Sequence, residues 1–129
     1  MNKILVEVSV GELLDKISIL EIKQEKIKDP EKLKFINNEL NILKDQLDNN
    51  VKSDEKLNNL FQSLKDINAK LWVIEDDKRL CEKNSDFTKD FIRLSRDVHF
   101  LNDDRARIKL EMNNHTGSKI KEIKEYTSY

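Results

Sequence analysis

Apolar residues recur at alternating spacings of three and four along three long stretches of this 129-residue chain. Such a repeat places the apolar side chains on one stripe of an α-helix, along the seam where helices pack together. The chain holds only two glycines and one proline, so it has little material for turns or sheets. The pattern therefore predicts an all-α fold. The three seams are Leu33, Ile36, Leu40, Leu43 and Leu47; Leu57, Leu60, Leu64, Ile67, Leu71 and Ile74; and Phe87, Phe91, Leu94, Val98 and Leu101.

Start signals divide the chain into about four helices. Ser9 stands where a helix N-cap is expected, with Glu12 three residues later as in a capping box. Asp29 and Pro30 form a second start signal, because proline fits the first helical turn. We therefore expect a single domain over residues 1–129, an antiparallel helical bundle in which the third and fourth helices form a long hairpin. The expected helices span residues 10–28, 30–48, 54–83 and 86–113.

Both ends of the chain carry short apolar segments outside these helices. Residues 3–8, KILVEV, are β-prone and are expected to be extended. A lone strand is not stable, so this segment must pair with a partner chain or with the tail, or lie on the helices. Ile120, Ile123 and Tyr126 predict either a short helix at residues 119–126 or a docked tail.

The charge balance excludes several classes of function. The 24 basic and 25 acidic residues leave a net charge near zero, which argues against a nucleic-acid or membrane-surface binder.

No segment approaches the roughly 18 apolar residues of a membrane span. The single cysteine, Cys81, cannot form an internal disulfide, and no Cys/His set has metal-ligand spacing. We expect a cytoplasmic protein that holds no cofactor and no metal.

Arg105 occupies a seam position where an apolar residue is due. A buried guanidinium group without a partner is very costly, so Arg105 must find a carboxylate, carbonyl groups or a bound anion. Asp15, Glu21 and Asp66 are the candidate protein partners, and a ligand phosphate or carboxylate held bidentately is the alternative. A structural salt bridge and a ligand site both stay open. The candidate ligand-binding residues are Arg105, Lys109, Asn102, Asp103, Glu21 and Asp15.

A second charged cluster lies in the expected hairpin. The segment EDDKR places three carboxylates on successive residues, and it should face the arginines of FIRLSRD on the next helix. The expected result is an ion-pair lattice in which Asp76 and Arg93 are close, each exposed pair contributing about 0–1 kcal/mol. The alternative is an anion or divalent-cation site, the latter drawing also on Glu21 and Glu25. The cluster comprises Glu75, Asp76, Asp77, Arg79, Arg93 and Arg96.

Three strings of the sequence carry a resemblance. They are VEVSVGELLDKISILEIK at residues 6–23, LWVIEDDKRLCE at residues 71–82, and NDDRARIKLEMN at residues 102–113 with TGS at residues 116–118. Through them the chain resembles a family of small uncharacterised helical proteins of bacteria and phages, known only as a domain of unknown function. The resemblance covers nearly the whole chain and implies no activity. It implies that the polar residues within these strings are the best candidates for a shared site.

The far end of the expected hairpin carries apolar residues that the rest of the chain cannot cover, among them Trp72, Val73, Phe91 and Ile92. Exposed apolar surface of this kind marks an interface. We therefore expect a homo-oligomer, with a dimer favoured, and a further protein as another partner. The function indicated is non-enzymatic assembly or interaction. The alternative is a protein that binds, or an enzyme that acts on, a phosphorylated or carboxylated metabolite between its helices.

Overall fold

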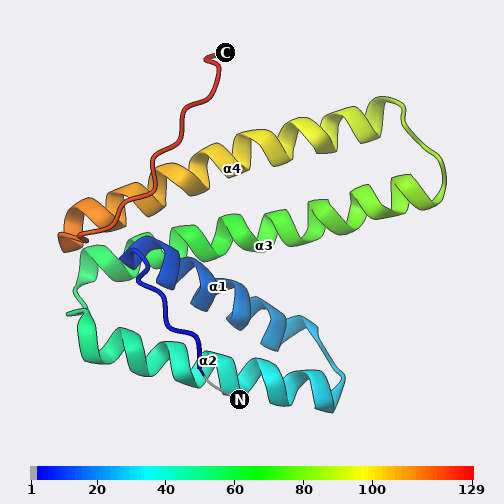
Figure 1. Cartoon of the computed structure of the whole chain (residues 1–129). Coiled ribbons are helices and arrows are strands. Elements are labelled where there is room, and N and C mark those ends of the chain that lie inside the picture. Colours follow the sequence, from blue (N-terminus) through cyan, green and yellow to red (C-terminus); the bar gives the residue numbers. More distant parts are fainter. Residues whose placement is uncertain (1–2) are drawn as a thin grey trace.

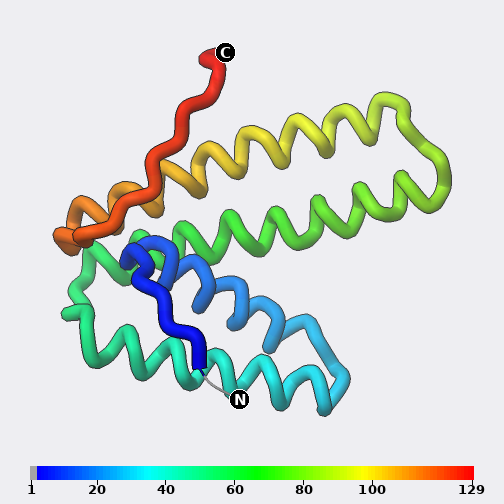
Figure 2. The backbone as a smooth tube through the Cα atoms, viewed as in Figure 1, coloured from blue at the N-terminus to red at the C-terminus, as the bar shows by residue number. Residues whose placement is uncertain are grey.

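The computed structural model describes residues 3–129, in which four α-helices form (Figure 1). The longer helices α3 and α4 make an antiparallel hairpin, and the shorter pair α1 and α2 packs against one end of it (Figure 1, Figure 2). The other end of the hairpin extends beyond α1 and α2. This arrangement confirms the all-α fold and the long hairpin that the seams predict. The helices are α1 (Val10–Lys26), α2 (Pro30–Asn50), α3 (Glu55–Lys83) and α4 (Lys89–Thr116).

Side-chain caps fix where the first three helices begin. The Ser9 hydroxyl oxygen accepts a hydrogen bond from the Glu12 amide at 3.1 Å. Asp29 caps α2 ahead of Pro30, and its carboxylate accepts from the second amide of that helix. Asp54 caps α3 in the same way. Each cap satisfies an amide that has no partner inside the helix, which is why these starts could be read from the sequence.

Helix α4 begins at Lys89, three residues later than the expected start at residue 86. Ser85 has a left-handed φ of 52°, and the Asp86 carboxylate accepts from the Thr88 amide at 3.2 Å. These local bonds keep residues 85–88 in the loop, since short polar side chains compete with helical hydrogen bonding there. At its other end α4 continues to Thr116 and stops at Gly117, whose φ is 68°. Glycine adopts this left-handed conformation without strain.

Helix α1 is the centre of the fold because its apolar side chains face two sides. One core cluster joins α1 to α2, and a second joins α1 to α3 and α4. A helix whose apolar stripe is this broad must contact more than one neighbour. The first cluster contains Leu13, Ile17, Leu20, Ile36 and Leu40. The second contains Leu14, Leu57, Leu64, Ile108 and Met112.

The N-terminal segment is extended, and its apolar side chains face solvent. Ile4 and Leu5 are 89% and 86% exposed, and residues 3–8 pair with no other strand in the described chain. A lone β-prone segment was expected to pair with another strand or to lie on the helices, and within one chain it does neither.

The expected short helix at residues 119–126 does not form, and residues 118–129 run back across α4 without regular structure (Figure 1). An isolated segment of this length is too short to be helical unless a neighbour buries one of its faces. The tail instead touches α4 through side chains. The Tyr129 ring lies 4.7 Å from that of His99, and its hydroxyl donates to Asp103.

Candidate functional site

The N-terminus of α1 and the C-terminal end of α4 cross at very close range. The Gly11 amide donates to the Asn113 side-chain oxygen at 2.7 Å, and the Val10 amide donates to the Ser118 hydroxyl oxygen at 3.2 Å. With Ser9, these side chains satisfy three orphan amides at the start of α1. A Cβ atom on Gly11 would lie 2.7 Å from the Lys109 carbonyl oxygen. The crossing therefore requires glycine at this position.

One turn farther along α1, Asp15 forms a buried ion pair with Arg105 of α4. Asp15 is only 1% exposed. Arg105 donates through Nε to Oδ1 at 3.0 Å and through Nη2 to Oδ2, which is the bidentate geometry that guanidinium and carboxylate groups favour. Of the three protein partners considered for Arg105, the structure uses Asp15. Because the pair spans two helices far apart in sequence, it fixes the register of α1 on α4.

Lys109 adds a second cation to this pair and is largely buried. Its ammonium group lies 2.8 Å from Glu12 and 3.6 Å from each of Asp15 and Glu122. Three carboxylates therefore surround Lys109, and its side chain is only 11% exposed. Lys109 is occupied by protein carboxylates and is not available to hold a ligand anion alongside Arg105.

Asn68 of α3 completes the arrangement from the third side. Its amide nitrogen donates to Asp15 Oδ1 and to the Ser18 hydroxyl, both at 2.8 Å. Ser18 in turn donates to the Asp15 carbonyl oxygen at 2.7 Å. We call Asp15, Ser18, Asn68, Arg105 and Lys109 the buried polar network. It ties together the three helices that meet at α1, and among residues 3–129 no buried side-chain polar atom lacks a partner.

The network sets the protonation state of Asp15. Burial by itself raises the pKa of this carboxyl group, but hydrogen bonds from Arg105 and Asn68, with the charges of Arg105 and Lys109, outweigh burial. The net effect holds the pKa of Asp15 below its ordinary value of 3.8. The same hydrogen bond to Asp15 raises the pKa of Arg105, against the opposing effect of burial. Both partners therefore stay charged at neutral pH.

This shift predicts a loss of stability in acid. A carboxyl group whose pKa is lower in the folded than in the unfolded protein stabilises the fold above its unfolded pKa, and that stabilisation disappears as pH falls through the folded pKa. We expect the free energy of unfolding to fall steeply below about pH 4. In the variant Asp15→Asn the starting stability should be lower and the further loss in acid smaller. Chemical unfolding at a series of pH values measures both; parallel curves for the two proteins would show that Asp15 is not the group responsible.

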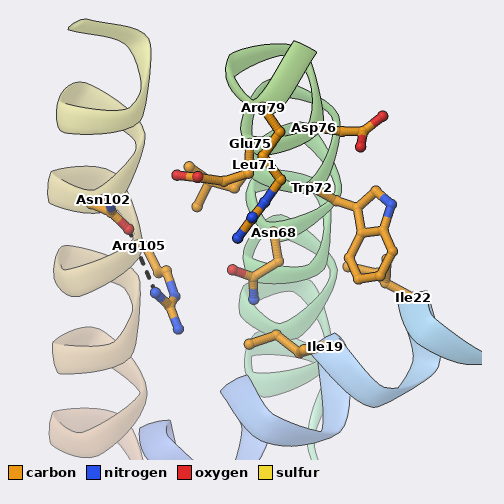
Figure 3. Close-up of a pocket in the computed structure, with 10 residues that line it drawn as sticks. All are labelled: Ile19, Ile22, Asn68, Leu71, Trp72, Glu75, Asp76, Arg79, Asn102 and Arg105. Atoms are coloured by element: carbon orange, nitrogen blue, oxygen red, sulfur yellow. Dashed lines mark hydrogen bonds between the residues drawn. The ribbon is translucent and has the colours of Figure 1, made fainter. Parts of the chain in front are cut away.

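A cavity of about 480 Å³ lies beside the buried polar network, between α1, α3 and α4 (Figure 3). Ile19 and Ile22 of α1 form one wall, and Asn102 and Arg105 of α4 form another. A volume in this range is typical of pockets for small molecules. Helix α3 contributes Asn68, Leu71, Trp72, Glu75, Asp76 and Arg79.

The structure brings four of the six residues proposed for a ligand site into contact with one another and places the other two elsewhere. Arg105 and Asn102 line the cavity, with Nη1 of Arg105 at 3.5 Å from the Asn102 side-chain oxygen. Asp15 and Lys109 belong to the buried polar network, and Asp103 binds the tail through Tyr129. Glu21 lies elsewhere, 3.7 Å from Lys65, and lines a different cavity between α1, α2 and α3. The predicted set of six is therefore not one site.

The expected ion-pair lattice across the hairpin does not form. No ion pair within residues 3–129 joins the EDDKR segment to Arg93 or Arg96. Arg93 pairs with Asp90 on its own helix at 3.9 Å, and Arg96 lies over the Phe100 ring. The expectation of a close Asp76–Arg93 pair is wrong because Asp76 projects from the side of α3 that faces away from α4 (Figure 3). Instead Glu75, Asp76 and Arg79 line the cavity, and Asp77 lies outside it.

The carboxylate clusters form no metal site in the described part of the chain. Among residues 3–129 no three His, Cys, Asp or Glu side chains are close enough to share an ion. Glu25 lies 2.9 Å from Lys65, which Glu21 also approaches, so these two carboxylates pair with a cation of the protein. Burial and the nearby carboxylates raise the pKa of the Cys81 thiol, which makes it a weak nucleophile.

Two members of this region were not identified from the sequence. Asn68 flanks the second seam, and Ser18 stands inside the apolar face of α1. Trp72, expected as uncovered surface at the far end of the hairpin, instead lines the cavity together with Ile19 and Ile22 of α1. Ser18 lies one helical turn from Asp15 on an otherwise apolar face. This spacing of two polar residues is the sequence signal that could have predicted the network. Buried polar groups need partners, so such residues tend to meet.

The fold and these sites define a small all-α protein built around a central helix. A model described as a family of unknown function (DUF6165) matches residues 4–129. This span is nearly the whole chain, so the chain belongs to that family, and the expected membership of a family of unknown function is confirmed. No curated protein and no solved structure matches it. None of the four helices is long and apolar enough to cross a membrane within the described residues.

Proposed function

We propose that this protein functions in assembly, through the part of the α3/α4 hairpin that α1 and α2 leave uncovered, and that a second copy of the chain covers it. The observation that carries the proposal is the apolar surface of the hairpin. Val73 and Leu80 on α3 are 49% and 51% exposed, and Ile92 and Phe100 on α4 are 57% and 42% exposed. Apolar side chains repeated along a protruding arm are typical of an interface.

A groove on the hairpin collects part of this surface. Its volume is about 640 Å³, and it is lined mainly by the apolar side chains Val73, Ile74, Phe100 and Leu101. Val73 and Phe100 line the groove and are each nearly half exposed, so this face offers both a groove and apolar side chains that a second copy can contact. A self-complementary face of this kind suits a two-fold dimer.

The charges at the edge of the groove support a second copy as the occupant. Lys70 lines the groove from α3, Asp97 lines it from α4, and Lys26 at the end of α1 adds a second cation to its lining. None of the three has an ion-pair partner among residues 3–129. A two-fold axis that sets α3 of one copy beside α4 of the other brings Lys70 of each copy toward Asp97 of the other. Two hairpins joined in this way make a four-helix bundle with the seams inside.

Replacing Phe100 by glutamate tests the proposal. The change puts an unpaired charge into the middle of the interface, so we expect the dimer to weaken by about 100-fold or more. The helices should remain, because Phe100 is already 42% exposed in the single chain. Sedimentation equilibrium measures the association, and circular dichroism measures the helix content.

Phe35 supplies the matched control. It is a phenylalanine on α2 that is 78% exposed and lies outside the hairpin, so Phe35→Glu makes the same chemical change elsewhere. We expect this variant to dimerise like the unaltered protein. Dissociation by Phe35→Glu together with an intact dimer in Phe100→Glu would place the interface on α2 and overturn the proposal.

A further inference from the structure

The cavity between α1, α3 and α4 holds polar groups that the fold does not use. Arg105 donates hydrogen bonds to Asp15 from Nε and Nη2. Its third nitrogen, Nη1, is directed to Asn102 at the edge of the cavity. Because the Asn102 oxygen accepts from Arg105, its amide nitrogen remains as a donor. The α4 wall therefore offers two donors at one place.

Arg79 adds a cation from the opposite helix. Its side chain runs down along α3 toward Asn68 and the level of Arg105 (Figure 3). Within residues 3–129 no carboxylate lies in ion-pair range of its guanidinium group. An unpaired guanidinium group directed into a cavity is suited to a carboxylate, which it can bind through two parallel hydrogen bonds.

The same cavity also offers acceptors. Asn68 uses both hydrogens of its amide nitrogen on Asp15 and Ser18, so its side-chain oxygen is the group left for the cavity. The Glu75 side chain extends toward α4, and its carboxylate has no ion-pair partner among residues 3–129 (Figure 3). A negative carboxylate here disfavours a ligand that is only an anion. It favours a ligand that carries a cation as well.

The third feature is an apolar wall on the α1 side of the cavity. Trp72 lies over Ile22, with Ile19 near the base (Figure 3). Such a wall can remove an apolar group of a ligand from water, which favours binding. Donors, acceptors and apolar surface thus lie together in a volume of about 480 Å³, which is enough for a molecule the size of an amino acid.

From this juxtaposition we propose that the cavity binds a free α-amino acid with a large apolar side chain. The ligand carboxylate binds Arg79, Nη1 of Arg105 and the Asn102 amide. Its ammonium group donates to Glu75 and to the Asn68 oxygen. Its side chain packs on Trp72 and Ile22. The site needs no second subunit, because every residue comes from one chain.

Trp72 makes the proposal easy to test, because it is the only tryptophan in the chain and lies in the cavity wall. Titration of the whole protein with leucine, methionine or phenylalanine should change the tryptophan fluorescence to saturation at micromolar to millimolar ligand. Two analogues of leucine separate the contributions of its charged groups: isocaproate lacks the ammonium group, and isopentylamine lacks the carboxylate. We expect each to bind at least about tenfold more weakly than leucine.

Two variants assign the charged groups. Arg79→Gln should weaken leucine binding by about tenfold or more, while Glu75→Gln should remove the preference for leucine over isocaproate. Arg93→Gln is the matched control, because Arg93 is an exposed arginine of the same hairpin that pairs with Asp90. It should bind leucine normally. Both tested residues are exposed, and circular dichroism verifies that the variants stay folded.

The inference is overturned by any one of three results. They are an unchanged fluorescence spectrum and unchanged amide NMR shifts with all three amino acids at millimolar concentration, equal affinity for leucine and isocaproate, and normal leucine binding by Arg79→Gln. The outcome is independent of assembly. The dissociated variant Phe100→Glu should still bind leucine, so failure of the dimer and failure of the ligand site can be told apart.

Discussion

Replacing Asp15 by alanine is expected to lower the free energy of unfolding by about 3–5 kcal/mol. Asp15 is 1% exposed and accepts hydrogen bonds from Arg105 and Asn68, and Lys109 lies 3.6 Å away. Without it, two cations and an amide face one another with no compensating charge. Thermal unfolding should show a drop in Tm of roughly 10 °C or more.

Asp104→Ala is the matched control for this prediction. Asp104 pairs with Arg107 on α4 at 3.1 Å, but both side chains are well exposed, so its loss should cost about 0–1 kcal/mol. The double variant Asp15→Ala with Arg105→Ala should be less destabilised than the sum of the two single changes, because each single change leaves a buried partner unpaired. Additive effects, or a loss below about 1 kcal/mol for Asp15→Ala alone, would show that water reaches the pair.

Gly11→Ala is expected to destabilise the protein by about 1–3 kcal/mol. The new Cβ would lie 2.7 Å from the Lys109 carbonyl oxygen and 3.1 Å from the Asn113 side-chain oxygen. Backbone cannot move aside cheaply, so α1 must shift away from α4 and strain the Asn113 and Asp15 contacts. In a solvent-exposed helix, replacing glycine by alanine would raise the free energy of unfolding by about 1 kcal/mol. A decrease for Gly11→Ala, instead of an increase, is therefore the expected sign of the close crossing.

Lys16→Ala provides the comparison, because Lys16 is exposed on the same helix. Its effect should stay within about 0.5 kcal/mol. Urea unfolding of both variants measures the two free energies on one scale. A Gly11→Ala protein as stable as the unaltered one would mean that α1 and α4 do not cross as closely as described.

The fold could be predicted because its signals are local. The spacing of Leu33, Ile36 and Leu40, and the caps Ser9 and Asp29, act within a few residues of themselves. The start of α4 was expected at residue 86, which is too early, because the left-handed φ of Ser85 and the hydrogen bond from the Thr88 amide to Asp86 keep these residues in the loop. The sequence left two possibilities for the tail, a short helix or a docked segment. Its apolar residues do not distinguish them, because a segment this short becomes helical only where a neighbour buries one of its faces.

The site could be predicted only in part, because its geometry depends on which faces of three helices meet. The seam position of Arg105 required a buried partner, and Asp15 was among those considered. The sequence does not show whether Asp15 or Glu21 pairs with Arg105. Both residues lie on α1, and the rotation of that helix about its axis determines which of them faces α4. The same rotation turns Glu21 to Lys65. The position of Asp76 was wrong for this reason too, because charge alone does not fix on which side of α3 it projects.

The structure brings together the three strings that the sequence analysis singled out. The first string contains Gly11 and Asp15, and the third contains Arg105, Lys109 and Asn113, so these two meet at the crossing of α1 and α4. The second string lines the cavity beside that crossing. Much of their polar content therefore stabilises the fold, and the groups left over lie at the proposed ligand site.

The solution mass of the unaltered protein tests the assembly proposal most directly. One chain has a mass of 15.3 kDa. Light scattering coupled to size-exclusion chromatography, repeated over a wide range of protein concentration, should give twice that mass, and Phe100→Glu should return it to that of one chain. A mass of one chain at every concentration would contradict the account, because the apolar face of the hairpin would then need no second copy.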